Sequence, residues 1–193
     1  MSAPFTTEDT HQMTWAEFDS LINTLIAKVS YLDGNSQINV IAPLLRTGGI
    51  VGSVLSIKMK IVTMLPVQFK YSHHPTTINQ ILSIPDILHK APQSLNILLC
   101  EGNTNSGSIA TKAAQVIKEK FPEAKIYLAT LTKVFGGPEK LDGIDAIFFG
   151  KMTDENKIAN EKQKEDFDIR GGITIFPWEN SADELSDINA ATS

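Results

Sequence analysis

The stretch Ile97–Ser108, which reads ILLCEGNTNSGS, decides how the chain folds. Its first four residues form a short apolar run, typical of a strand that is buried on both faces of a sheet. Glu101 and a small polar loop follow, and the apolar spacing of Ile109–Phe121 then predicts a helix. A buried strand that leads through a polar loop into a helix is the basic unit of an α/β protein.

The same alternation extends along the whole chain. Thr14–Glu17 has the spacing of a capping box at the start of a helix over 14–29, and a second helix is predicted over 50–59. Strands are predicted over 38–43, 61–71, 96–100, 125–133, 146–149 and 173–176, and loops over 44–49, 72–77 and 101–108. Residues 78–88 are undecided between helix and strand, 152–167 is a charged and exposed segment, and 181–193 is a frayed acidic tail.

This order of elements predicts one α/β domain over 1–193, with a mostly parallel twisted sheet flanked by helices. Its core spans about 13–180, with polar tails at 1–12 and 181–193. In such sheets ligands bind where the strands end at their carboxyl side. The predicted loops 44–49 and 101–108 both leave strands there and lead into helices, so they are the first places to expect a site.

Composition excludes several classes of protein. The net charge of −5 gives no electrostatic footprint for nucleic acid. The longest apolar runs are too short to span a bilayer, and residues 1–11 contain no apolar segment of a secretory signal. The single cysteine, Cys100, falls in an apolar run, which indicates a buried strand residue in a reducing compartment. We therefore expect a cytoplasmic protein with no membrane and no nucleic-acid partner.

The loop after Glu101 has the composition of a phosphate site. A helix N-terminus offers unpaired backbone N–H groups and a partial positive charge, and Gly107 allows a ligand to approach the backbone. Asn105, Ser106 and Ser108 add side-chain donors. The alternative is a plain helix cap and turn, which small polar residues often form. Neither a Walker A sequence nor a dinucleotide fingerprint is present.

Two segments resemble the type I phosphoribosyltransferases. In that family a strand ends in acids that face the ribose hydroxyls of phosphoribosyl pyrophosphate, and a loop wraps its 5′-phosphate. Glu101 matches the first acid, with a further role toward metal-bound water, and Asn105–Ile109, which reads NSGSI, matches the loop. Val40–Gly49, which reads VIAPLLRTGG, resembles the pyrophosphate loop, so Arg46, Thr47 and Gly48 are implied to bind pyrophosphate. Mg²⁺ is implied on the diphosphate, held mostly by substrate oxygens and water.

Two further segments resemble the bacterial and archaeal hypoxanthine and xanthine-guanine members. Ala129–Lys133 resembles the strand whose terminal lysine contacts a purine 6-oxygen, and Phe176–Glu179 resembles the segment after the base-binding strand. The resemblance implies base contacts from Lys133, Ile173 and Thr174, a small hood segment, and a homo-oligomeric dimer or tetramer. From the residues alone, Lys133 is equally well read as the polar end of a strand.

The motifs also depart from the family. Gly102 stands in place of the second acid, and Asn105 stands where purine enzymes carry an aspartate toward the base. Ile109 replaces the last threonine of the phosphate loop, and Ile173 replaces an aromatic that stacks on the purine. These changes weaken the prediction of catalysis by Glu101 and Asn105 more than the prediction of the fold.

Three functions stay open on this sequence. The first is an enzyme, a pentosyl-class glycosyltransferase of purine salvage that joins a purine base to phosphoribosyl pyrophosphate and releases pyrophosphate. The second is a binding or regulatory protein on the same fold that senses a nucleotide or the sugar diphosphate without chemistry. The third is a transferase that acts on a different base. Release of pyrophosphate separates the enzymes from the binding protein.

Overall fold

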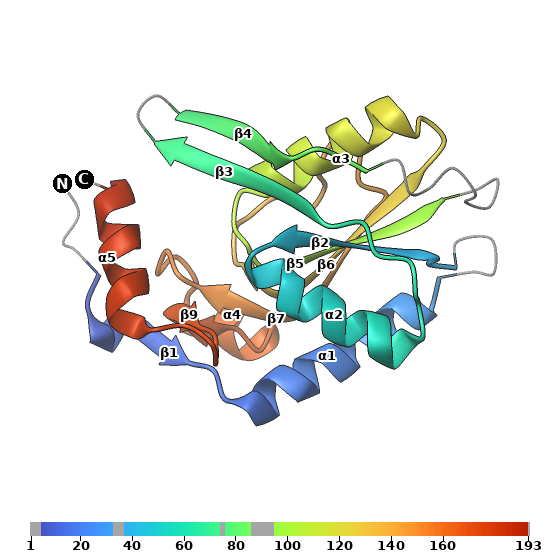
Figure 1. Cartoon of the computed structure of the whole chain (residues 1–193). Coiled ribbons are helices and arrows are strands. Elements are labelled where there is room, and N and C mark those ends of the chain that lie inside the picture. The colour runs from blue at the N-terminus through green and yellow to red at the C-terminus, as the bar shows by residue number, and fades with distance from the viewer. Residues whose placement is uncertain (1–4, 33–36, 74–75, 86–94, 193) are drawn as a thin grey trace.

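The computed structural model describes residues 5–32, 37–73, 76–85 and 95–192 (Figure 1). The helices are η1 (Thr7–Asp9), α1 (Trp15–Ser30), α2 (Thr47–Met59), α3 (Ser108–Lys120), α4 (Glu161–Asp166) and α5 (Ser181–Thr192). The strands are β1 (Thr10–Gln12), β2 (Val40–Leu45), β3 (Val67–His73), β4 (Thr76–Leu82), β5 (Asn96–Thr104), β6 (Lys125–Val134), β7 (Ala146–Asp154), β8 (Arg170–Gly171) and β9 (Ile173–Ile175). Strands and helices alternate along most of the chain, as the sequence predicts.

Seven of the strands form one sheet in the order β4-β3-β2-β5-β6-β7-β8. Every neighbouring pair in it is parallel except the β3–β4 hairpin. β1 and β9 pair in parallel as a separate small sheet, which we call the hood together with the chain that follows β9 as far as Glu179. The prediction of a single α/β domain with a mostly parallel sheet and a small hood segment is confirmed.

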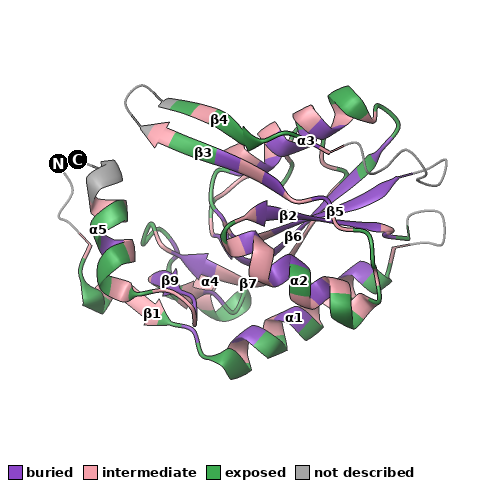
Figure 2. Cartoon of the chain, in the orientation of Figure 1, coloured by how far each residue is buried: buried purple, intermediate pink, exposed green. Residues whose placement is uncertain are grey.

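Helices cover both faces of the large sheet. α1 and α2 lie against one face and α3 against the other, and each side has its own cluster of buried apolar side chains (Figure 1). Figure 2 shows the buried residues concentrated along β2 and β5, at the centre of the sheet. Strands buried on both faces explain the nearly continuous apolar runs of the sequence. None of the helices in the described part of the chain has the length and apolar character needed to cross a membrane.

Aromatic side chains fasten the hood to the first helix. Trp178 stacks on Phe176 with ring centroids 5.2 Å apart, and it meets Phe18 of α1 edge-on at 5.4 Å. The backbone N–H of Met13 donates to the carbonyl of Ile175 at 2.8 Å, at the point where the chain passes from β1 to α1. These aromatic contacts with α1 and the hydrogen bond from Met13 hold the hood over one end of the sheet.

The strands and helices run further into the predicted loops than the sequence suggested. The predicted loop 44–49 is wrong, because β2 continues to Leu45 and α2 begins at Thr47. β5 takes up the first four residues of the predicted loop 101–108, and β7 extends five residues beyond 149. β4 covers the first five residues of the undecided segment, 78–82, and the predicted frayed tail contains α5. His73 ends β3, whereas His74 lies outside the described residues.

Candidate functional site

A cavity of about 360 Å³ lies at the carboxyl ends of β2, β5 and β7, and we call it the main cavity. It is lined by Leu44, Leu45, Arg46, Thr47, Gly48, Phe69, Glu101, Gly102, Asn103, Asn105, Ile109, Glu155, Ile173, Thr174, Phe176, Glu179, Glu184 and Ile188. A second cavity of about 180 Å³, the loop cavity, is lined by Tyr71 and residues 101 and 103–109. The two cavities share four lining residues, so they form one continuous site at the edge where ligands bind in parallel sheets.

The first helix N-terminus at this site belongs to α2. Arg46 is its N-cap residue, and a cis peptide bond joins Leu45 to Arg46. A Cβ atom at Gly48 would lie 2.1 Å from the carbonyl oxygen of Cys100, so only glycine lets the start of α2 pack this closely against β5. Backbone N–H groups at the start of α2, the partial positive charge there and the Arg46 guanidinium all favour an anion.

The second helix N-terminus belongs to α3. Gly107 is its N-cap residue and has a φ of +69°, a left-handed conformation that favours glycine. The Ser106 and Ser108 hydroxyl oxygens lie 2.6 Å apart, and the Ser106 oxygen accepts from the Ser108 N–H at 3.4 Å. Both side chains line the loop cavity. The loop thus combines hydroxyl donors with a helix N-terminus, as an anion site requires.

Glu101 lies between these two helix ends and lines both cavities. Its Oε2 accepts from the Thr104 hydroxyl at 2.8 Å. Burial raises the pKa of Glu101 to about 7, although the Thr104 hydrogen bond acts in the opposite direction. A carboxylate so placed can accept hydrogen bonds from hydroxyl groups of a ligand held by the two helix ends.

A hydrogen-bonded chain extends from β5 toward β7. The Asn103 amide Nδ2 donates to Glu155 Oε1 at 2.8 Å, and its Oδ1 accepts from the Thr132 hydroxyl at 3.0 Å. The Asn103 side chain thus links Thr132 to Glu155. Burial raises the pKa of Glu155 to about 7, opposed by the hydrogen bond from Asn103. The main cavity thus contains a second carboxyl group that is close to its titration point at neutral pH.

The hood and α5 add acidic side chains to the main cavity. Glu179 accepts from the backbone N–H of Phe176 at 2.9 Å. Burial raises the pKa of Glu179 and the charge of Glu184 on α5 raises it further, while the Phe176 hydrogen bond and the charge of Arg46 lower it. Ile188, one turn further along α5, also lines the main cavity. Any anion bound near Arg46 would therefore also face two carboxyl groups.

The structure brings most of the predicted site residues together. The main cavity contains Arg46, Thr47, Gly48, Glu101, Asn105, Ile109, Ile173 and Thr174, and the loop cavity adds Ser106, Gly107 and Ser108. Lys133 lines neither cavity. Its ammonium group donates to the carbonyl of Gly137 at 3.3 Å, and its side chain is 7% exposed. Its predicted contact with a base stays a prediction.

Sequence reasoning missed several lining residues, among them Asn103, Glu155 and Glu184. Glu155 directly follows Asp154, the last residue of β7, so it stands at the carboxyl end of a parallel strand. The rule that ligands bind at this edge would have indicated it, had the strand not been expected to end at residue 149. Nothing in the sequence indicated Glu184, because α5 returns to the site from a segment that was expected to be a frayed tail.

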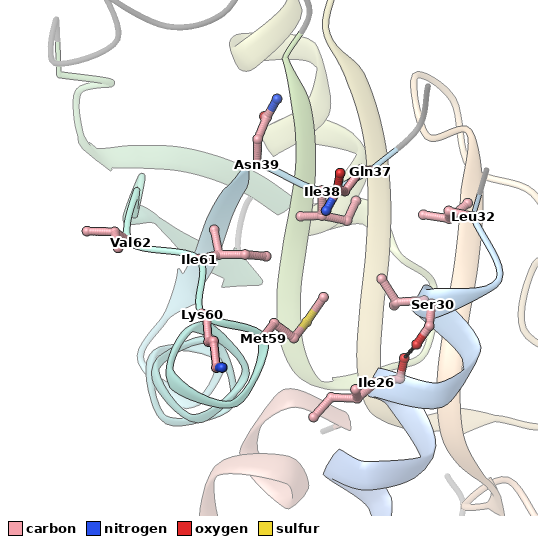
Figure 3. Close-up of a pocket in the computed structure, with 11 residues that line it drawn as sticks. Ile26, Ser30, Leu32, Gln37, Ile38, Asn39, Met59, Lys60, Ile61 and Val62 are labelled. Atoms are coloured by element: carbon pink, nitrogen blue, oxygen red, sulfur yellow. Dashed lines mark hydrogen bonds between the residues drawn. The ribbon is translucent and has the colours of Figure 1, made fainter. Parts of the chain in front are cut away.

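A larger cavity of about 620 Å³ lies at the opposite end of the sheet (Figure 3). It is bordered by the last turns of α1 and α2 and by the chain that enters β2, with Ile26, Ile38, Met59 and Ile61 among its apolar members. Lys60 is the charged residue among those that line it. Among the described residues that line it there is neither a helix N-terminus nor a carboxyl group, so its chemistry suits phosphate or sugar less well than the main cavity.

No family model matches the chain, and no curated protein matches it at a significant level. Solved structures do match. A purine phosphoribosyltransferase from Pyrococcus horikoshii is 17% identical over 89% of this chain and 95% of its own, with a TM-score of 0.64. A xanthine-guanine-hypoxanthine phosphoribosyltransferase from Helicobacter pylori is 19% identical over 92% and 99%, with a TM-score of 0.60. A hypothetical protein from Neisseria gonorrhoeae with bound ppGpp is 14% identical over 96% and 98%, with a TM-score of 0.56.

Likenesses at such low identity concern the path of the chain and not the chemistry of its side chains. They extend over nearly the whole length of both partners in each comparison. The chain therefore has the fold of the type I phosphoribosyltransferases.

Proposed function

We propose that this protein is a phosphoribosyltransferase that joins a purine base to phosphoribosyl pyrophosphate and releases pyrophosphate. One observation carries the proposal: two helix N-termini, those of α2 and α3, stand at one sheet edge on either side of Glu101. Two anion sites separated by a carboxylate match a ligand with a phosphate at each end of a polyhydroxyl ring.

The proposed contacts follow from this arrangement. Residues 105–109 take the 5′-phosphate, Arg46–Gly48 take the pyrophosphate, and Glu101 accepts from the ribose hydroxyls. Ile173 and Thr174 border the end of the main cavity where the base would lie. Most of the rate enhancement would come from holding both reactants together and from stabilising charge on the leaving diphosphate.

Mg²⁺ fits this site as a partner of the diphosphate. Among the described residues, no group of three histidine, cysteine or acidic side chains could hold a metal ion. Hard cations bind oxygen ligands and are often held by substrate phosphates and water, with few protein ligands. Glu101, Glu179 and Glu184 line the main cavity and would supply negative charge around such an ion. When bound, Mg²⁺ would neutralise charge on the leaving pyrophosphate.

A second candidate is a nucleotide-binding protein without turnover. Gly102 in place of a second acid and Asn105 in place of an aspartate favour it. The similar Neisseria gonorrhoeae protein has bound ppGpp, a guanine nucleotide with phosphates at two positions of its ribose. Such a ligand would also use both helix N-termini and the carboxylate between them.

The test is pyrophosphate release. The purified protein is mixed with Mg²⁺, phosphoribosyl pyrophosphate and, one at a time, hypoxanthine, guanine, xanthine, adenine, uracil and orotate. We expect release with at least one 6-oxopurine and formation of the matching nucleotide in equal amount. Release with a pyrimidine alone would support a transferase of different base specificity. Binding of nucleotides without release from any base would favour the second candidate.

A further inference from the structure

Glu155 is a partly buried carboxyl group that follows β7 and lines the main cavity. Asp154, the residue before it, accepts hydrogen bonds from the N–H groups of Ile158 and Ala159 at 2.8 and 3.1 Å, so the turn after β7 is held in place. Asn103 donates to Glu155 Oε1. Among the hydrogen bonds and ion pairs of the described residues, none engages Glu155 Oε2. One oxygen therefore fixes the side chain and the other remains available to a ligand in the main cavity.

The sheet order places Glu155 at one end of the site. β2, β5, β6 and β7 follow one another in the sheet, so Arg46 after β2 and Glu155 after β7 are separated by the width of these four strands, with Glu101 on β5 between them. Ile173 and Thr174 of β9, which lies against β7, line the same cavity. With pyrophosphate near Arg46 and ribose near Glu101, the group that attacks the sugar lies near Glu155.

The proposed reaction needs a proton acceptor at this place. A ring nitrogen of the base forms a bond to C1 of the ribose, the bond from C1 to the pyrophosphate oxygen breaks, and pyrophosphate leaves with that electron pair. The base nitrogen also loses its proton. The amide of Asn105 cannot take it, because an amide has no basic site of use near neutral pH. A carboxylate within hydrogen-bonding reach is a suitable general base.

We propose that Glu155 accepts the proton that the incoming base loses, a role that rests on the proposed transferase function. The carboxylate takes the proton as the carbon–nitrogen bond forms and passes it to water after the products leave. A general base works best when its pKa lies near the working pH, and burial brings Glu155 close to that condition. The other charged groups that line the main cavity are Arg46, Glu101, Glu179 and Glu184.

The test replaces Glu155 by glutamine, which can still accept the hydrogen bond from Asn103. The protein is assayed with Mg²⁺, phosphoribosyl pyrophosphate and the base that supports turnover in the panel above. For Glu155→Gln we expect kcat to fall by about 100-fold or more. Affinity for phosphoribosyl pyrophosphate with Mg²⁺ should stay within about twofold, because the two phosphate sites lie elsewhere in the cavity. Glu161→Gln, on the exposed helix α4, is the matched control.

Two further readouts separate proton transfer from a structural role. The kcat/KM of the unmutated protein should decline below a pH of about 7, and the decline should be less steep in Glu155→Gln, because Glu155 no longer titrates there while Glu101, with a pKa also near 7, still does. In Glu155→Ala, added formate or acetate should restore part of the turnover, because a small carboxylate can occupy the vacated space. A structural role predicts neither result.

The outcomes separate this inference from the function on which it rests. Turnover by the unmutated protein together with an unchanged kcat in Glu155→Gln would overturn the role of Glu155 and leave the transferase standing. Lost turnover in Glu155→Ala with no rescue by small carboxylates and an unchanged pH profile in Glu155→Gln would also overturn it. Absence of turnover with every base, despite binding of phosphoribosyl pyrophosphate, would overturn both proposals.

Discussion

At position 102 the fold leaves no room for a side chain. A Cβ atom there would lie 2.3 Å from Thr47 Cγ2 and 3.0 Å from Phe176 Cε2. An aspartate at 102 would supply the second acid that Gly102 replaces. The packing argues against this, because α2 and the hood both press against β5 at this point. The second acid cannot be returned to Gly102 without moving one of them.

This crowding can be measured through folding stability. We expect Gly102→Ala to lower the free energy of unfolding by about 1–3 kcal/mol, the usual cost of overpacking. Thr47→Ser removes the nearest methyl group, so the double variant should recover at least about 0.5 kcal/mol relative to the sum of the single changes. Gly171→Ala, with no atom within 4 Å of the added Cβ, is the control. Strict additivity in urea denaturation would contradict the contact.

Burial of Glu101 should leave a signature in the pH dependence of stability. Its pKa in the folded protein is about 7, above the 4.5 of an exposed glutamate. Between these values the folded state binds more protons than the unfolded state, so stability is lost as pH rises through this window. Glu101→Gln should remove the loss, making the variant more stable above pH 7 by up to about 3 kcal/mol.

The control for this prediction is the stability of both proteins at low pH. Below a pH of about 4.5 both states hold a protonated Glu101, so the variant and the unmutated protein should unfold at nearly the same urea concentration. Equal stability of the two proteins across the whole range from pH 4 to pH 8 would show that Glu101 titrates at the same pH in the folded and unfolded states.

Two residues show how much of the candidate site can be predicted from the sequence at this scale. Glu101 could be predicted, because it stands between an apolar run and a small polar loop, and the structure places it in the main cavity. Lys133 also ends an apolar run, but its ammonium group donates to Gly137. Side-chain direction at a strand end depends on the turn that follows. A pattern of residue types does not contain that information.

At the scale of elements, the positions of the strands could be predicted from the sequence, but their carboxyl ends could not. The apolar runs of β5 and β7 predicted their positions, but polar residues at their carboxyl ends looked like loop. Asn103 and Thr104 nevertheless pair with Thr132 and Lys133 in β6. Pairing between neighbouring strands satisfies the backbone groups whatever the side chains are. Functional strand ends are therefore the part of this fold that residue patterns describe least well.

The helix α5 is the element with the most direct effect on the site. It buries Leu185, and the Asn189 side chain exchanges two hydrogen bonds with the backbone of Phe5, at 2.8 and 3.0 Å. Its Glu184 faces the main cavity and raises the pKa of Glu179. A helix held in this way places negative charge beside the proposed pyrophosphate site, so we expect a bare anion to be a poorer ligand there than its magnesium complex.

Removal of that charge should favour free pyrophosphate. We expect Glu184→Gln to tighten binding of pyrophosphate without Mg²⁺ by about two- to fivefold at low salt, the effect of one partly exposed charge. Asp183→Asn changes the same net charge on the same helix, but Asp183 is exposed and does not line the cavity. Calorimetric titration of the three proteins checks this. An equal gain in both variants would point to net charge alone.

At the scale of the whole molecule, the proposed function requires that ligand binds at the carboxyl end of the sheet. The cavity at the amino end is larger, about 620 Å³ against about 360 Å³, but mostly apolar side chains line it. The carboxyl end carries two helix N-termini, an arginine and several carboxyl groups. The sequence predicted that the polar loops gather at this end, because the topology of a parallel sheet fixes where they lie. Because the two cavities lie at opposite ends of the sheet, a substitution at one should not affect binding at the other. Substitutions can therefore show which cavity binds the ligand.

The central claim is that the carboxyl end of the sheet binds phosphoribosyl pyrophosphate through the loop 105–109. The most direct measurement is a calorimetric titration of this compound, with Mg²⁺, into the unmutated protein and two variants. One variant joins Ser106→Ala with Ser108→Ala, and the other is Val62→Ser at the opposite cavity, where the side chain is 93% exposed. We predict one site per chain, at least about tenfold weaker in the serine variant and unchanged in Val62→Ser. No binding to the unmutated protein, or an equal loss in both variants, would contradict the claim.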